Sequence, residues 1–128
     1  APELARALTR THAGRFDAGP FVQGWVWERL PWPVSADEIA AATTDRVVLA
    51  PNPVTALPLP DPDTRAVLVH KTGGTGGFGA WIGIVPEAGT GLVLLANGNH
   101  PTTPRVQLGA RLLAARIAEQ TRQAPPPR

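Results

Sequence analysis

Apolar residues recur at helical spacing at the start of the chain and alternate with polar residues in the segment that follows. Residues 3–12 are predicted to form a helix that ends before Gly14, with an apolar face made of Leu4, Ala7 and Leu8. Residues 21–29 alternate well enough to predict a strand, which Pro31 and Pro33 would end.

A short helix is predicted to begin at Ser35 and to end near Ala42. Ser35-Ala36-Asp37-Glu38 has the pattern of a capping box, with Ser35 as the N-cap and Glu38 three residues later. The next segment, residues 50–63, is rich in proline, which gives up backbone donors and fixes the backbone. It is therefore predicted to be a semi-rigid surface loop.

The second half of the chain has three apolar segments, at residues 66–70, 80–85 and 91–96. Because a natural hairpin turn joins the last two, the three segments predict an antiparallel meander. The last helix begins near Thr103 and Pro104, and Gly109 inside it costs about 1 kcal/mol relative to alanine. Its apolar face consists of Val106, Ala110, Leu113 and Ile117.

These elements predict an α+β fold in which the two terminal helices cover one antiparallel sheet. The length permits a single domain, and residues 123–128 are predicted from their proline-rich composition to be a disordered tail. The chain begins with Ala1-Pro2, which is neither a start methionine nor a signal-peptide pattern. We expect it to begin inside a longer gene product or after processing.

Composition excludes several kinds of chemistry. The chain has no cysteine and no tyrosine, which excludes a disulfide scaffold, a cysteine nucleophile and a phenolic acid or base. Its only serine, Ser35, is followed by Ala-Asp-Glu and starts no Ser-x-x-Lys motif. The three histidines lack the spacing of metal ligands, so neither a metal nor another cofactor is predicted. Such a chain is a weak candidate for a complete enzyme.

The charge pattern predicts neither a nucleic-acid partner nor a membrane partner. The net charge is +2, and the arginines are scattered along the chain rather than gathered in a block. No apolar run approaches the roughly 20 residues that span a bilayer.

The run Gly74-Thr75-Gly76-Gly77-Phe78-Gly79 formally matches G-x-G-x-x-G after a strand. A dinucleotide site requires a helix next and an acidic residue about 20 positions later, but a strand follows and Asn99 stands there. Too little chain remains for a kinase, and no Gly-Lys-Ser/Thr ends the run. The remaining alternative is a structural turn between strands.

The residues before this run favour another interpretation. Lys71-Thr72-Gly73 is a motif of the penicillin-recognising serine enzymes, and Lys71 is the only lysine of the chain. The stretch Val69 to Gly79 resembles the corresponding region of class C β-lactamases, as do residues 94–99 with Pro101 and Arg105. Further upstream, Gln23-Gly24, Trp27-Glu28 and Trp32-Pro33-Val34 also resemble that family.

The resemblance implies that the chain is the C-terminal part of a serine β-lactamase/DD-peptidase fold, with residues 1–122 as the C-terminal segment of the catalytic domain. The nucleophilic serine, its lysine partner and the Tyr-x-Asn tyrosine would then belong to an N-terminal segment, which is the expected partner. The reaction would be acyl transfer from the β-lactam to serine, followed by hydrolysis. Lys71 would supply a fixed ammonium, and the N–H of Gly74 would form half of the oxyanion hole.

The resemblance also implies which residues bind the substrate. Thr72 would offer a hydroxyl near the substrate carboxylate, and Gly73 with Gly74 would let the acylamide lie along the strand edge. The other residues matching positions near the carboxylate are Asn99, Thr102 (where the family often has asparagine) and Arg105. A positive charge in the first turn of a helix is mildly unfavourable, which is a further reason to expect a functional role for Arg105.

The family assignment implies a periplasmic enzyme whose substrates are β-lactams, cephalosporins by family preference. One alternative is a D-alanyl-D-alanine carboxypeptidase or an esterase of the same fold. Another is a non-catalytic chain that only completes the sheet. His70 is predicted to face the core rather than to take part in chemistry.

Overall fold

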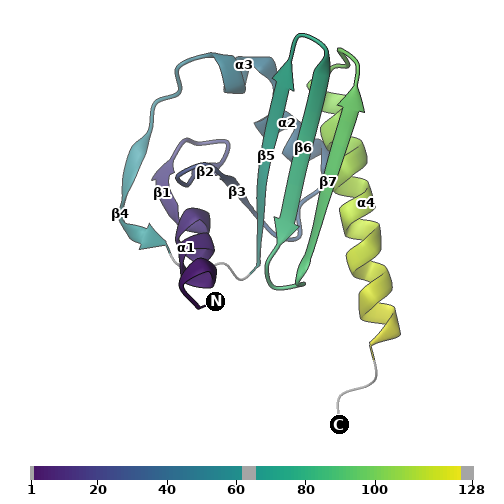
Figure 1. Cartoon of the computed structure of the whole chain (residues 1–128). Helices are drawn as coiled ribbons and strands as arrows, with labels where there is room; N and C mark the ends of the chain where they lie inside the picture. Colours follow the sequence, from purple (N-terminus) through teal and green to yellow (C-terminus); the bar gives the residue numbers. More distant parts are fainter. Residues whose placement is uncertain (1, 62–65, 125–128) are drawn as a thin grey trace.

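A computed structural model describes residues 2–61 and 66–124, which form one antiparallel sheet with four helices. The strand order is β4-β1-β2-β3-β5-β6-β7 (Figure 1). The strands are β1 (Gly14–Asp17), β2 (Val22–Gln23), β3 (Glu28–Pro31), β4 (Thr55–Asp61), β5 (Val67–Thr75), β6 (Phe78–Val85) and β7 (Thr90–Asn97). The helices are α1 (Pro2–His12), α2 (Ala36–Ala42), α3 (Asp45–Leu49) and α4 (Thr102–Gln123). The α+β fold class is confirmed.

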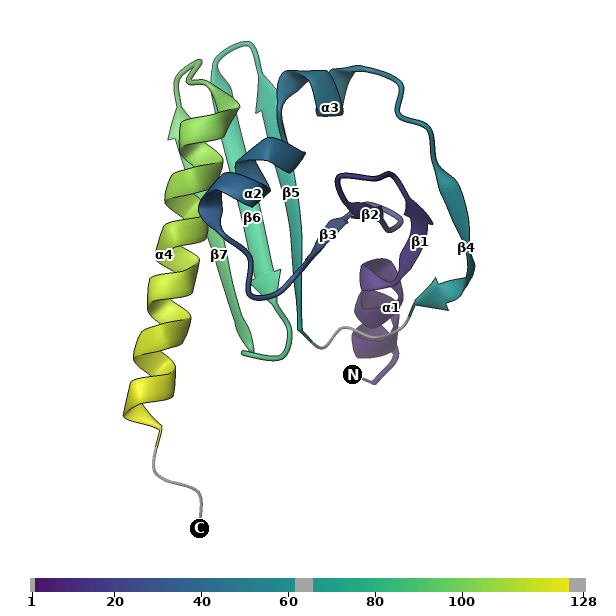
Figure 2. The same cartoon turned by 180° about the vertical axis from the view of Figure 1, so that it is seen from behind.

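The core lies between the β5–β6–β7 meander and the two helices α2 and α4, which cover one face of it (Figure 2). Trp81 of β6 is fully buried there against α4. The predicted apolar face of α4 is confirmed, since three of its members are buried and Ile117 packs against the core. Side chains alternate along β6, so every second residue points to this core and the others point to the opposite face.

The first helix, α1, does not cover the core as predicted. Its position agrees with the prediction, but it contains no buried residue, and Leu4 and Leu8 on its apolar face are more than half exposed. Among the described residues the helix therefore has an apolar face without a covering element.

The prediction of one strand over residues 21–29 is wrong, because a turn interrupts it between residues 24 and 27. Two short strands, β2 and β3, pair antiparallel around a turn in which the N–H of Gly24 donates to the carbonyl of Trp27 at 2.8 Å. The side chain of Gln23 donates to the same carbonyl at 3.2 Å. Alternation alone did not reveal the turn, because Trp25 is apolar and yet exposed at its tip.

The proline-rich segment is also more regular than predicted, because residues 55–61 form strand β4. This strand pairs with β1, from Thr55 opposite Asp17 to Asp61 opposite Gly14, with an irregularity in between. β4 is the outermost strand of the sheet, and an edge strand tolerates proline because one side of its backbone needs no partner.

The glycine run is mostly strand rather than loop. Gly73 and Gly74 belong to β5 and Gly79 to β6, which leaves Gly76 and Gly77 as the turn. The predicted meander of three sequential antiparallel strands is confirmed.

The last helix begins at Thr102, after Pro101, one residue before the predicted start near Thr103. Pro104 is accommodated in the first turn, where backbone N–H groups have no partner within the helix. The helix includes Gln123, and the rest of the predicted tail lies outside the described residues from 125 onward. No helix in the described ranges is long and apolar enough to cross a membrane.

The predicted capping box is present at α2. Ser35 Oγ accepts from the N–H of Glu38 at 3.1 Å, and the N–H of Ser35 donates to Glu38 Oε2 at 2.9 Å. Replacing Ser35 by alanine is expected to lower the free energy of unfolding by about 1 kcal/mol, because the N–H of Glu38 loses its acceptor, whereas the backbone N–H at position 35 can still donate to Glu38. Ser35→Asp, which keeps an acceptor, should stay near wild type in urea denaturation. Equal losses in both variants would contradict the capping role.

Candidate active site

The second half of β5 has an open edge. Strand β3 pairs with β5 only from Val67 to His70, whereas β6 pairs with β5 from Val69 to Thr75. Within the described ranges, residues 71–75 therefore have no strand partner on the side away from β6. The open edge carries the Lys71-Thr72-Gly73 motif and faces the short helix α3 (Figure 1).

A pocket of about 350 Å³ lies along this edge. It brings together six of the seven residues predicted from the sequence, from β5 and from the start of α4: Lys71, Thr72, Gly73, Gly74, Thr102 and Arg105. The seventh, Asn99, is exposed and does not line the pocket.

The far wall of the pocket comes from the segment that follows α2. Its residues, Thr43, Asp45, Val48 and Leu49, were not predicted. The sequence offers a weak signal for them, since Thr44-Asp45 before two valines is a possible helix start. Their proximity to β5 depends on the chain path between two elements far apart in sequence.

Glu28 holds Lys71 in place; the sequence indicated Glu28 only as part of the Trp27-Glu28 family resemblance. The Nζ of Lys71 donates to Oε1 of Glu28, which lies opposite His70 on the neighbouring strand β3. The Glu28 side chain is buried, while the Lys71 side chain is 37% exposed at the pocket. A buried carboxylate requires a charged or hydrogen-bonding partner, so the pair anchors the ammonium at the pocket wall.

His70 lies beside this ion pair and is fully buried, as predicted. Its Nδ1 is 3.9 Å from Oε2 of Glu28, and its ring stands 6.5 Å from that of Trp81. Burial, and secondarily the charge of Lys71, lower the pKa of His70 to about 4. His70 is therefore neutral at pH 7 and leaves Lys71 as the cation that pairs with Glu28.

The lowered pKa predicts a loss of stability in acid. Between about pH 6.5 and pH 4 the unfolded chain binds a proton at His70 that the folded chain does not, so unfolding is favoured as the pH falls. Full protonation is expected to cost about 3 kcal/mol of unfolding free energy. His70→Gln should remove this part of the pH dependence in urea denaturation from pH 7 to pH 4. Identical pH profiles for the variant and the wild type would contradict it.

Arg105 supplies the second cation of the pocket. It is only 7% exposed in the first turn of α4, where its Nη1 donates to the carbonyl of His100 at 3.2 Å and its Nη2 to Thr102 Oγ1 at 3.4 Å. Its Nε is buried and has no hydrogen-bond partner among residues 2–61 and 66–124. Neither acceptor carries a charge, so the guanidinium favours an anionic ligand in the pocket.

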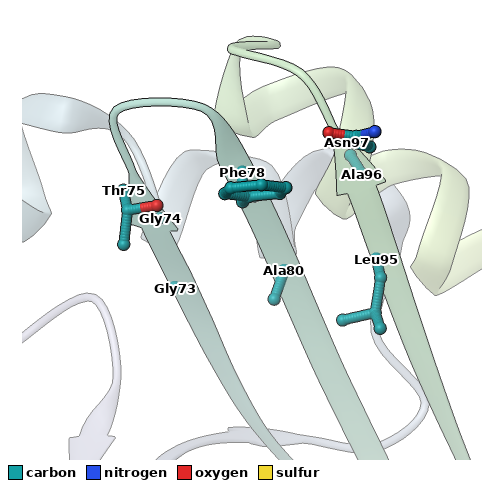
Figure 3. A pocket seen from close by; sticks show the side chains of 9 residues that line it. Gly73, Gly74, Thr75, Phe78, Ala80, Leu95, Ala96 and Asn97 are labelled. Carbon is teal, nitrogen blue, oxygen red and sulfur yellow. The ribbon is translucent and has the colours of Figure 1, made fainter.

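A second, apolar depression of about 590 Å³ lies at the same end of the meander. Figure 3 shows Phe78, Ala80 and Leu95 next to one another over β6 and β7. Phe78 and Leu95 are 63% and 76% exposed, and they lie on the face opposite to Trp81 and α4. Within the described ranges, no cluster of three or more metal-ligating side chains is present.

Comparisons with known proteins show the family to which the chain belongs. The beta-lactamase family profile matches residues 1–116. The β-lactamase of Escherichia coli (strain K12) is 43% identical over 112 residues, which are 88% of this chain and 30% of that protein.

Solved structures show the same similarity. A class C β-lactamase from Rhodobacter sphaeroides superposes with a TM-score of 0.79 and 38% identity, over 92% of this chain and 33% of that one. The D-alanine carboxypeptidase AmpC from Burkholderia cenocepacia gives a TM-score of 0.84 and 40% identity, over 90% and 33%. The chain thus spans about a third of the length of these proteins. It belongs to the beta-lactamase family, and its fold matches part of the class C enzymes.

Proposed function

We propose that this chain provides one side of the active site of a class C-like serine β-lactamase. The enzyme would hydrolyse β-lactams through an acyl-serine intermediate. The observation that carries the proposal is the pocket at the open edge of β5, where a buried carboxylate holds Lys71 and where Arg105 presents a second cation.

In the proposed reaction, a serine Oγ attacks the β-lactam carbonyl, the amide C–N bond breaks, and the nitrogen takes up a proton. Water then hydrolyses the ester. The ammonium of Lys71 would lower the energy of anionic neighbouring groups. The N–H of Gly74 would donate to the developing oxyanion, a contribution of about 3 kcal/mol in the transition state.

The open strand edge suits a substrate that carries an amide. A Cβ placed at Gly73 would meet nothing within 4 Å, and one at Gly74 would meet only the carbonyl of Phe78 at 3.6 Å. An acylamide can therefore lie along this edge as an added strand would. Thr72, Thr102 and Arg105 surround the place proposed for the substrate carboxylate, and Asn99 would have to turn toward it from outside the pocket.

The nucleophile would come from a further segment, the N-terminal part of the fold. Two exposed apolar surfaces support this part of the proposal: the face with Phe78, Val93 and Leu95, and the face of α1 with Leu4 and Leu8. Contiguous exposed apolar surface usually marks an interface. The relatives are also about three times as long as this chain. An assembled enzyme of this family would act in the periplasm.

A second candidate function is hydrolysis of D-alanyl-D-alanine peptides, favoured by the 40% identity to the Burkholderia carboxypeptidase. Both reactions use the same acyl-enzyme chemistry, but their substrates differ. A β-lactamase releases the opened lactam quickly, whereas a carboxypeptidase releases D-alanine from a peptide and is acylated by the lactam for long times.

The proposal is tested by complementation with a chromogenic cephalosporin. The 128-residue chain alone is expected to give no turnover, since it lacks the nucleophile that the proposal requires. Co-expression with the N-terminal part of a class C β-lactamase should restore turnover, and release of D-alanine from a dipeptide is measured in parallel. Turnover by the chain alone would refute the shared-site mechanism. An inactive but stable complex would leave only the non-catalytic alternative.

A further inference from the structure

Gly79 lies directly over the guanidinium of Arg105. It belongs to β6, where it pairs with Gly74 of β5 on one side and with Ala96 of β7 on the other. It is buried and lies two residues before Trp81, so it faces α4 like Trp81. Because it has no side chain, the Arg105 guanidinium occupies the space below the strand. A Cβ at this position would come within 2.6 Å of Arg105 Cζ and closer still to Nη1.

The three nearest atoms that this Cβ would meet all belong to the guanidinium group. That group is the far end of a long, flexible side chain, and the backbone at Gly79 does not have a positive φ. An alanine here would therefore displace Arg105 rather than the sheet. Gly109 differs, because a Cβ there would meet the buried ring of Trp81.

Hydrogen bonds hold Arg105 only loosely. Its two hydrogen bonds, of 3.2 Å to His100 O and 3.4 Å to Thr102 Oγ1, are at the long end for charged donors. In the part of the chain that the structure describes, the buried Nε has no hydrogen-bond partner. Close packing under Gly79 is then the main constraint that fixes where the guanidinium stands in the pocket.

We propose that Gly79 is a positioning residue which sets the place of the Arg105 guanidinium and thereby the affinity of the pocket for a carboxylate-bearing ligand. A guanidinium binds a carboxylate through two parallel hydrogen bonds, and this geometry is lost when the group shifts by about 1 Å. The substrate class follows from the proposed function, on which this inference rests: β-lactams with a free carboxylate, as distinct from their esters.

The first test measures binding, which does not depend on hydrolysis. The 128-residue chain is titrated with cephalothin, and the Arg105 Nε–H resonance is followed by ¹⁵N NMR. Gly79→Ala is expected to shift this resonance in the free protein and to weaken cephalothin binding at least fivefold. Gly77→Ala is the matched control, because a Cβ at Gly77 meets nothing within 4 Å. An Arg105 resonance and an affinity unchanged by Gly79→Ala would overturn the inference.

The second test separates action through Arg105 from a general packing effect. Gly79→Ala is expected to weaken binding strongly when Arg105 is present and by less than twofold in the Arg105→Ala background. The methyl ester of cephalothin, which has no free carboxylate, should bind the wild-type chain and Gly79→Ala equally. An equal loss in both backgrounds, or an equal loss for the ester, would show a purely structural role and refute the proposal. Carboxylate binding with this pattern, but without turnover in the complemented enzyme, would refute the hydrolase function and leave the role of Gly79 standing.

Discussion

Replacing Lys71 by alanine in the complemented enzyme is expected to lower β-lactam turnover at least a hundredfold, while the fold survives. A hundredfold loss corresponds to about 2.7 kcal/mol in the barrier, the scale expected when a positioned charge that stabilises the transition state is removed. The fold should persist because the Lys71 side chain is 37% exposed and packs only at the edge of β5. The measurement is kcat with a chromogenic cephalosporin, together with circular dichroism of the variant.

Two companion variants separate the roles of the ammonium and of its partner. Lys71→Arg keeps the charge but replaces the compact ammonium by a planar group, so intermediate turnover is expected. Lys71→Ala leaves Glu28 buried without its cation, which lowers stability, and adding Glu28→Gln should recover part of that loss without recovering turnover. Turnover of Lys71→Ala at the wild-type rate would contradict the assignment of Lys71.

The largest effect on stability is expected for Trp81→Ala, which should lower the free energy of unfolding by about 3–5 kcal/mol. Trp81 is fully buried between the sheet and α4, with its ring against Gly83 and Gly109. Because Gly83 and Gly109 have no side chains that could fill the space left by the ring, the substitution would leave a cavity. Phe78→Ala on the same strand is the control: Phe78 is 63% exposed, so its loss should cost less than 1 kcal/mol in urea denaturation. Similar losses for both variants would contradict this description of the core.

Gly109 provides an independent check of that packing. A Cβ at Gly109 would stand 2.7 Å from Cζ3 of Trp81, so Gly109→Ala should destabilise the wild-type chain despite the better helix propensity of alanine. In the Trp81→Ala background the clash is gone, and the same change should stabilise. Destabilisation in both backgrounds would show that Trp81 is not the reason for this glycine.

Local pattern was sufficient for elements whose stability depends on neighbouring residues. The capping box at Ser35 and the meander of β5 to β7 could be predicted because their signals lie within a few residues of one another. The hairpin between β2 and β3 and the edge strand β4 were missed. An apolar turn residue such as Trp25 and a proline in an edge strand are tolerated only because of where the chain places them.

The candidate site divides in the same way. Lys71, Thr72, Gly73 and Gly74 are consecutive, so a short motif was enough to find them. Glu28 is 43 positions away from Lys71, and only the pairing of β3 with β5 brings its carboxylate to the ammonium. Asp45 and its neighbours reach the pocket through α3, whose position no local pattern encodes.

By itself, the sequence determined the α+β class, the capped helix, the meander and the family motif at the end of β5. Each of these depends on residue type and spacing along the chain. Only the tertiary structure decided that the motif edge is open, that Glu28 holds Lys71, and that the glycines at 79 and 109 make room for Arg105 and Trp81. The physical reason is that a missing side chain and a buried charge are favourable only in relation to the group that lies against them, and that group comes from a distant part of the chain.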